Sequence, residues 1–341
     1  MGQQPLSEEA AKAAVDAFLK TGSILGAAKE LGLSRQGVQN RLDAAARMGL
    51  CKPRGEPNPS RWRPFESVVQ ARKEEFRRVK DAGDGRTIHR VAMADNGPYC
   101  LIALGDPHLD SPGTDLGLWE RWIEPLDAGK HIHGLALGDW LDNWVGKLQH
   151  IWGSSETPAP EGWVLFEGYL DQIADHLLAS VSGNHDDWSG YTDLLGYMMR
   201  QRGVLHRANS IRVGLAGPNG RTITIGMRHR FAGNSQWNPA HAVMKAAQMG
   251  WRDTLLIGGD KHISGDGLVR CPDSGKLTWA YQVAAFKVMD DYGDQLGLMD
   301  KHVSPAVAFV VDPRRADNDP QLITAFHEPD AAVDYLGFLR R

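Results

Sequence analysis

The stretch LLASVSGNHD, residues 177–186, places the polar tetrapeptide Gly183-Asn184-His185-Asp186 directly after an apolar run. A short apolar run that ends in a glycine-bearing polar loop is typical of a buried strand that brings side chains to the edge of a sheet. The same pairing occurs four more times: YCLIAL (99–104) precedes GDPHLD, GLAL (134–137) precedes GDWLDN, ITIGM (223–227) precedes RHRF, and TLLIG (254–258) precedes GDKH.

Helical patterns alternate with these apolar runs. Apolar residues at helical spacing predict helices at 115–126, 160–176, 191–202 and 238–249, and further strands are expected near 279–286, 305–311 and 321–326. This alternation predicts an α/β domain over residues 97–341. Strand ends at one edge of a sheet converge in space, so the five polar loops are expected to meet.

The five loops carry side chains that bind divalent cations. Carboxylate oxygens, amide oxygens and imidazole nitrogens suit hard and borderline ions. Two ions need a bridging carboxylate and several further ligands. Seven candidates follow from the loops: Asp106, His108, Asp139, Asn184, His229, Asp260 and His262.

His229 is the exceptional candidate, because Arg228 and Arg230 flank it and would repel a cation. These two arginines are instead candidates for binding a substrate phosphate. His241 is the reserve ligand.

In order and spacing, these motifs resemble the signature of the calcineurin-like metallophosphoesterase superfamily, which is DxH, GDxxD, GNHD or GNHE, a lone histidine, and GHxH. The matching segments are 106–108, 138–142, 183–186, position 229 and 259–262, so the resemblance covers about residues 100–265. It implies a four-layer α-β-β-α sandwich of two mixed sheets flanked by helices. It also implies metal-dependent hydrolysis of phosphate esters.

The resemblance assigns the candidate ligands to two ions. It implies that one ion is held by Asp106, His108, Asp139 and His262, and that the other is held by Asp139, Asn184, His229 and Asp260. Asp260 departs from the pattern, because the family usually has histidine there. A carboxylate favours harder ions, so we expect Mn²⁺, with Mg²⁺, Zn²⁺, Fe or Ni as alternatives.

The resemblance also implies the catalytic residues. His185 follows a ligand without being one, and it is expected to protonate the leaving oxygen of the substrate. The second acid of GDxxD, Asp142, is expected to pair with His185 and keep it protonated.

Residues 1–50 predict a small all-α domain. Ser7 is placed to cap a helix that runs to about Leu19, and two further helices are expected at 23–31 and from Ser34, joined at Gly32. This segment resembles helix-turn-helix DNA-binding domains. The resemblance implies DNA contacts from the start of the last helix, by Ser34, Arg35, Gln36, Gln39, Asn40 and Arg41. The alternative is a helical hairpin used for docking or for a homo-oligomer.

Residues 51–96 connect the two predicted domains. CKPRGEPNPSRWRPF (51–65) is rich in proline and arginine and predicts a linker, and a charged helical pattern follows at 66–81. Residues 1–90 contain 17 Lys and Arg against 11 Asp and Glu, whereas the remaining residues contain 21 against 31. The positive charge of residues 1–90 favours binding of a polyanion by this segment, while the negative charge of the rest of the chain favours binding of cations. Solvated helix faces of opposite charge would give the same distribution.

Composition indicates a soluble globular protein, with 42% hydrophobic and 23% charged residues. The three cysteines, Cys51, Cys100 and Cys271, form no CxxC pair, which favours a reducing cytoplasm. The first residues lack the pattern of a secretory signal, and no apolar stretch has the length of a membrane span. We therefore expect a cytoplasmic location and no membrane partner.

These observations favour a DNA nuclease or phosphodiesterase with a DNA-binding head. Such fusions resemble phage or mobile-element proteins. One alternative is a small-molecule phosphomonoesterase or nucleotide phosphodiesterase whose N-terminal helices serve dimerisation. Another is a DNA-binding regulator with a decayed phosphoesterase fold, which the substitution at Asp260 supports.

Overall fold

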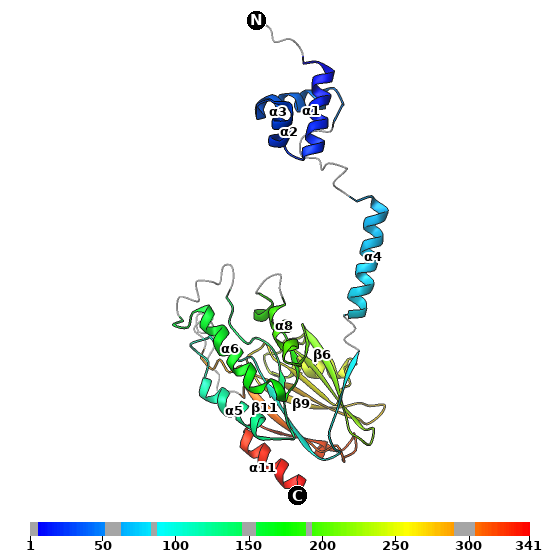
Figure 1. Cartoon of the computed structure of the whole chain (residues 1–341). Coiled ribbons are helices and arrows are strands. Elements are labelled where there is room, and N and C mark those ends of the chain that lie inside the picture. Colours follow the sequence, from blue (N-terminus) through cyan, green and yellow to red (C-terminus); the bar gives the residue numbers. More distant parts are fainter. Residues whose placement is uncertain (1–5, 52–62, 83–86, 145–154, 189–192, 290–303) are drawn as a thin grey trace. The chain divides into compact units, whose positions relative to one another are not determined.

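The computed structural model describes residues 6–51, 63–82, 87–144, 155–188, 193–289 and 304–341 (Figure 1). The chain divides into two compact units, Met1–Asp84 and Gly85–Arg341. Most of the Pro- and Arg-rich segment predicted as a linker, residues 52–62, lies outside the described residues. None of the described helices combines the length and the apolar composition that a bilayer crossing requires.

Three helices begin the first unit: α1 (Glu8–Thr21), α2 (Ile24–Leu31) and α3 (Arg35–Arg47). Each follows a serine, Ser7, Ser23 or Ser34, whose hydroxyl oxygen accepts the backbone N–H three residues further on. Gly22 and Gly32 end α1 and α2 in the left-handed conformation, with φ of 67° and 63°. The three helices lie where the sequence predicts them.

Small apolar residues hold these helices together. Ala17, Ala27, Ala28 and Val38 form one buried cluster, and their small side chains let the helix backbones approach closely. The longer helix α4 (Phe65–Ala82) follows, and its side chains are mostly exposed. The arrangement of α1 to α3 is compatible with the predicted DNA-binding role, which stays a prediction.

The second unit contains two six-stranded mixed sheets. In spatial order, the first sheet is formed by β1 (Ile88–Ala92), β6 (Ser210–Ala216), β7 (Thr222–Arg228), β8 (Leu255–Gly258), β10 (Leu277–Gln282) and β9 (Gly265–Arg270). The second sheet is formed by β12 (Ile323–Phe326), β11 (Ala306–Val311), β2 (Tyr99–Leu104), β3 (Ile132–Ala136), β4 (Leu177–Val181) and β5 (Leu205–Arg207). Strands β2 to β5 are parallel, as are β7, β8 and β10.

The burial pattern of β2 shows how the layers pack. Leu101 and Ala103 lie in an apolar cluster with residues of both sheets, whereas Cys100, Ile102 and Leu104 lie in a cluster with helix residues. Because successive side chains of a strand point to opposite faces, one face of the second sheet packs on the first sheet and the other on helices. Those helices are α5 (Leu116–Ala128), α6 (Ala159–Ile173), α8 (Leu194–Gln201) and α11 (Pro329–Arg340).

Helix α9 (His241–Gln248) covers the outer face of the first sheet, where it packs on Leu256 of β8 and Ala280 of β10. The layers are therefore helices, sheet, sheet and helix, which is the α-β-β-α arrangement that the sequence analysis expects. Short elements complete the unit: α7 (Asn184–Asp187), and the 3-10 helices η3 (Ala174–His176) and η4 (Pro320–Leu322).

Four strands lack a counterpart in the sequence analysis: β1, β5, β6 and β9. Strands β1, β5 and β9 are edge strands and β6 lies beside β1, and β1 and β9 alternate between exposed and half-buried residues. Such strands need no continuous apolar run. Strand β1 pairs with β6, so residues 88–92 belong to the two-sheet unit, although the sequence analysis counts them with the connecting segment 51–96.

Candidate metal centre

The seven candidate ligands lie on loops that follow five strands. Asp106 and His108 follow β2, Asp139 follows β3, Asn184 follows β4, His229 follows β7, and Asp260 and His262 follow β8. Strands β2, β3 and β4 are mutually parallel, and so are β7 and β8, so each sheet presents its loops at one edge. Contacts between side chains of the two sets bring them into one site, as described below.

The backbone is strained where these side chains leave it. Among the described residues, five that are not glycine have positive φ: His108 (42°), Asp139 (51°), Asn143 (42°), Asp260 (69°) and His262 (49°). Four of them are candidate ligands, and Asn143 follows the GDxxD segment. A left-handed conformation costs a non-glycine residue about 1–3 kcal/mol, and such strain is concentrated at functional sites.

Two motif glycines are explained by close backbone approach. A Cβ on Gly138 would lie 2.2 Å from the backbone nitrogen of Gly183, and a Cβ on Gly183 would lie 2.0 Å from Oδ1 of Asp139. The loops after β3 and β4 therefore touch where the motifs GD and GNHD begin. The Asp186 carboxylate joins the same loops, because it accepts the backbone N–H groups of Gly183 and Asp139, both at 2.8 Å, and of Trp140 at 3.1 Å.

Asp106, His108 and His262 form the first group of candidate ligands. Nε2 of His108 lies 3.2 Å from Nε2 of His262, which lies 3.7 Å from Oδ2 of Asp106. Nδ1 of His108 lies 2.9 Å from Oδ1 of Asp142, and a proton on Nδ1, next to this carboxylate, leaves Nε2 of the neutral ring without one. Two nitrogens that bind one ion, each at about 2.0–2.1 Å from it, would lie about as far apart as the Nε2 atoms of His108 and His262 do.

His229 is the centre of the second group. Its Nδ1–H donates to the backbone carbonyl of Leu137 at 2.7 Å, which directs Nε2 toward the other ligands. Nε2 lies 3.2 Å from Oδ2 of Asp139, 3.3 Å from Oδ1 of Asn184 and 3.8 Å from Oδ1 of Asp260. The ligand atoms of Asp106, Asp139 and His229 all lie within 4.8 Å of one another, which links the two groups.

The electrostatics of the site fit a cation. Asp106 is fully buried, and its Oδ1 has no hydrogen-bond partner among the described residues. Burial raises the pKa of Asp106 to about 7. Burial alone would lower the pKa of His229, but Asp106 and Asp139 raise it to about 10. Buried carboxylates that draw a proton onto a neighbouring histidine are a donor set that divalent ions suit.

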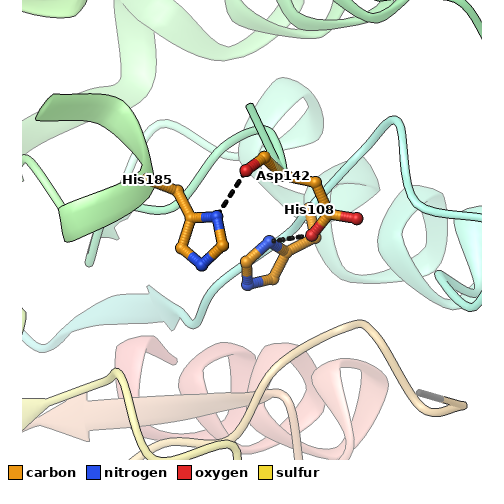
Figure 2. Close-up of side chains that lie close together, drawn as sticks. All are labelled: His108, Asp142 and His185. Atoms are coloured by element: carbon orange, nitrogen blue, oxygen red, sulfur yellow. Dashed lines mark hydrogen bonds and ion pairs between the residues drawn. The ribbon is translucent and has the colours of Figure 1, made fainter. Parts of the chain in front are cut away.

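Asp142 differs from the expectation. Its carboxylate is paired with His108, with Oδ1 2.9 Å from Nδ1, whereas the backbone carbonyl of Asp142 accepts Nδ1–H of His185 (Figure 2). Burial lowers the pKa of His185, and the nearby Asp139 and Asp142 offset this effect only in part. The sequence motif placed both residues at the site but could not show which atoms of Asp142 serve which ring.

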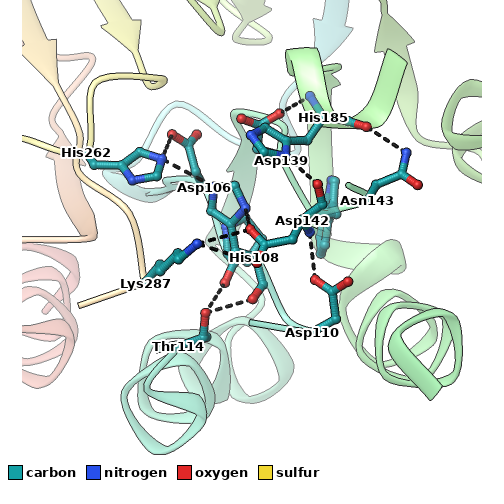
Figure 3. A network of polar contacts seen from close by, with 12 residues as sticks. Asp106, His108, Asp110, Thr114, Asp139, Asp142, Asn143, His185, His262 and Lys287 are labelled. Atoms are coloured by element: carbon teal, nitrogen blue, oxygen red, sulfur yellow. Dashed lines mark hydrogen bonds and ion pairs between the residues drawn. The ribbon is translucent and has the colours of Figure 1, made fainter. Parts of the chain in front are cut away.

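The cluster of His108, Asp142 and His185 also has ligand atoms within 4.8 Å of one another. The Asp142 carboxylate, however, is already paired with His108 and with the ammonium group of Lys287, whose Nζ lies 3.3 Å and 3.4 Å from its two oxygens (Figure 3). A cation there would meet the Lys287 charge. Because of this repulsion, we assign Asp142 and His185 to the support of the candidate metal centre, and we keep only His108 of this cluster as a candidate ligand, through its Nε2.

Three further acids or bases support the site without being predicted from the sequence. Asp110 accepts the backbone N–H of Asp142 at 2.6 Å, Asp186 joins the loops after β3 and β4, and Lys287 pairs with Asp142. Asp110 and Asp186 stand inside the motif segments GDPHLD and GNHD, which was the available signal. Lys287 stands in no motif, so only the tertiary structure reveals it.

The two arginines beside His229 lie in different places. Arg228 faces away from the ligands, and its guanidinium carbon lies 5.5 Å from the ring centre of Trp251 and 5.9 Å from that of Phe231, next to α9. Nε of the exposed Arg230 lies 3.3 Å from Oδ2 of Asp260. Arg230 is therefore at the metal centre, whereas Arg228 is not. The reserve residue His241 begins α9, where its ring approaches Gly233.

The predicted DNA contacts lie at the start of α3. Ser34 accepts the backbone N–H of Gly37 at 3.0 Å and so caps the helix. Arg35, Gln36 and Asn40 are exposed, and Gln36 donates to Asn40 at 3.0 Å. Two residues are half-buried, Gln39 and Arg41, and Gln39 donates to Asp43 at 2.7 Å.

Comparisons with known proteins add little to this geometry. No family model matches the chain, and no curated protein matches its sequence. Among solved structures, the chain is similar to a conserved uncharacterized protein, a predicted phosphoesterase, from Streptococcus pneumoniae TIGR4. The identity is 13%, the match covers 67% of this chain and 97% of that chain, and the TM-score is 0.30.

Proposed function

We propose that this protein hydrolyses phosphate esters with the help of two divalent metal ions. The observation that carries the proposal is the convergence of seven candidate ligand residues from the ends of five strands. Four of these seven residues have left-handed backbone. Strain maintained at so many ligand positions indicates selection for function rather than for stability. The order of the motifs, which resembles that of calcineurin-like metallophosphoesterases, adds the reaction class.

The candidate ligands would bind the two ions in two groups. Asp106, His108 and His262 would hold one ion, and Asn184, His229 and Asp260 would hold the other. Asp139 lies close to both Asp106 and His229, so it would be shared by the two ions. When bound, two such ions lower the pKa of a coordinated water and neutralise phosphoryl oxygens. The Leu137 carbonyl and the Asp142 carboxylate orient His229 and His108 through their Nδ1–H groups.

His185 would act on the leaving oxygen. Its Nδ1–H donates to the Asp142 carbonyl, so a second proton must reside on Nε2 before the ring can act as an acid. The pKa of His185 is lowered by burial, and the negative charge of a phosphate substrate would oppose that effect. His185 is therefore expected to take up its second proton when the substrate binds.

We favour a phosphodiester of nucleic acid as the substrate and Mn²⁺ as the metal. The support for DNA is the basic first unit, in which Arg35, Gln36 and Asn40 are exposed on α3. The support for Mn²⁺ is Asp260, because a carboxylate prefers a harder ion than a histidine does. Arg230, at the edge of the site beside Asp260, would pair with a non-bridging phosphate oxygen.

The test measures hydrolysis of bis(p-nitrophenyl) phosphate by the full chain after metal removal and after addition of Mn²⁺, Mg²⁺ or Zn²⁺. We expect activity only with added metal. Double-stranded DNA, single-stranded DNA, a mononucleotide and an aryl phosphomonoester are then compared. Preference for the mononucleotide or the monoester would move the substrate to a small molecule, and metal binding without hydrolysis of any of them would favour a DNA-binding regulator with a decayed site.

A further inference from the structure

Lys287 lies on a segment that is anchored to the metal centre. The segment follows β10, and its backbone bonds to the loop after β2 at several points: Phe286 N–H donates to the Asp106 carbonyl at 2.9 Å, and Val288 N–H donates to the Gly113 carbonyl at 3.0 Å. Thr114 and Lys287 form an isolated β-bridge between these contacts. The backbone of Lys287 is therefore fixed relative to the loop that carries Asp106 and His108.

The ammonium group of Lys287 forms a buried ion pair. Nζ lies 3.3 Å and 3.4 Å from the two carboxylate oxygens of Asp142, and the exposed fractions of the two side chains are 7% and 6%. Nζ also lies 5.3 Å from the ring centre of Trp144. Removing two charges from water costs several kcal/mol each, so stability alone does not account for this pair.

The same carboxylate orients a candidate metal ligand. Oδ1 of Asp142 lies 2.9 Å from Nδ1 of His108, so the carboxylate favours a proton on Nδ1, and Nε2 of His108 lies 3.2 Å from Nε2 of His262 (Figure 3). Lys287 therefore fixes the Asp142 carboxylate, and this carboxylate orients the His108 ring so that Nε2 faces the other candidate ligands. His185 packs edge-on against His108, with ring centres 4.9 Å apart. Its Nδ1–H donates to the backbone carbonyl of Asp142 and not to the carboxylate.

We propose that Lys287 is a positioning residue, whose ammonium group holds the Asp142 carboxylate against His108 and so fixes His108 Nε2 as a metal ligand. Its burial argues against direct contact with a substrate. The consequence for metal binding rests on the proposed function, whereas the orientation of the His108 ring does not. Loss of a residue that supports a metal ligand typically weakens metal binding by about 10–100-fold.

The first measurement is Mn²⁺ affinity of the full chain by calorimetry. Lys287→Met should weaken Mn²⁺ binding by about 10-fold or more, and Lys287→Arg should restore part of it, because a guanidinium can reach the same carboxylate. If Lys287 acts through Asp142, the double variant Lys287→Met with Asp142→Asn should bind Mn²⁺ no more weakly than Asp142→Asn alone. Additive losses would overturn the proposal.

A matched control separates positioning from general stability. Arg212 forms a partly buried ion pair with the fully buried Asp253, with Nη2 2.7 Å from Oδ1, in the same unit but outside the metal centre. Arg212→Met should lower the unfolding temperature measured in chelator and leave Mn²⁺ affinity unchanged. If Lys287→Met behaves in the same way as Arg212→Met, Lys287 has only a structural role.

The second measurement needs no metal. In metal-free protein, at a pH at which the His108 ring is neutral, nitrogen-15 NMR of the histidine rings should show His108 protonated at Nδ1 and bare at Nε2, with His108 assigned by the variant His108→Gln. Lys287→Met should produce a mixture of both tautomers. An unchanged tautomer would contradict the positioning role, whereas failure of the parent protein to bind Mn²⁺ would contradict the proposed function instead. If Lys287→Met does not fold, Lys287→Gln replaces it in both measurements.

Discussion

The first unit and the metal centre use polar side chains in opposite ways. On α3, Gln36 donates to Asn40, Gln39 donates to Asp43, and Ser34 caps the helix, so its polar groups pair with residues within four positions along the chain. At the metal centre, contacts join residues from Asp106 to Lys287, and several are buried.

This difference indicates where function constrains the molecule. Local pairing on a helix follows the intrinsic preference of the chain and is worth only about 0.2–0.5 kcal/mol per pair. The metal centre instead keeps ligands on left-handed backbone and buries carboxylates, each of which opposes folding. Substitutions should therefore have large and specific effects at the centre and small effects on the α3 surface.

The largest effect is expected for Asp139, which contacts His229 and accepts the backbone N–H of His185 at 2.9 Å. Asp139→Ala should remove metal and lower turnover of an aryl phosphodiester by about 10³–10⁵-fold, because metal ions supply several kcal/mol of transition-state stabilisation. Metal content by mass spectrometry and turnover are measured together. The control is Asp317→Ala, a carboxylate paired with Arg221 at the surface. Full activity in Asp139→Ala would remove it from the ligand set.

The next effect concerns His185, which touches Asp142 and His108 without joining the two ligand groups. His185→Ala should lower turnover by about 10²–10⁴-fold, the usual loss for a general acid, while both metals stay bound. Turnover and metal content are compared with those of His241→Ala, in which both should match the parent. Metal loss in His185→Ala would make His185 a ligand or its structural support.

Asp260 should show a smaller effect that depends on the ion. Its Oδ1 lies 3.8 Å from Nε2 of His229, and its Oδ2 forms an ion pair with Arg230. Asp260→Ala should weaken the second ion by about 10–100-fold, and Asp260→His should shift preference from Mn²⁺ toward Zn²⁺. The measurement is metal affinity and turnover under each ion. Identical behaviour of both variants and the parent would show that Asp260 is a turn residue.

The smallest effect is expected on α3, and it tests the predicted DNA contact. Arg35→Ala and Arg41→Ala should each weaken DNA binding modestly and reduce the salt dependence of the affinity by about one unit of slope, provided that each contacts a phosphate. Binding is measured by fluorescence anisotropy over a range of salt. Lys20→Ala is the control, because Lys20 is paired with Glu30 at 2.8 Å. DNA affinity equal to that of the parent would favour the dimerisation role.

Much of the fold could be predicted from the sequence, because buried strands produce apolar runs. Strands β2, β3, β4, β7 and β8 appear as such runs, and each motif loop follows one of them. Three edge strands, β1, β5 and β9, could not be predicted in this way, although the edge strand β12 could. Strand β1, IHRVA, alternates half-buried and exposed residues, so only its pairing with β6 assigns it to the sheet.

The sequence by itself determined the seven candidate ligands, because the loops after neighbouring parallel strands lie at the same edge of a sheet. It also determined the glycines at the loop contacts, since Gly183 has no room for a Cβ. Only the tertiary structure decided the hydrogen-bond partners: Asp142 serves His108 through its carboxylate and His185 through its carbonyl, and Lys287 arrives from 145 positions away. The reason is physical. Spacing along the chain fixes which loops meet, whereas the packing of side chains within the site fixes which atoms touch.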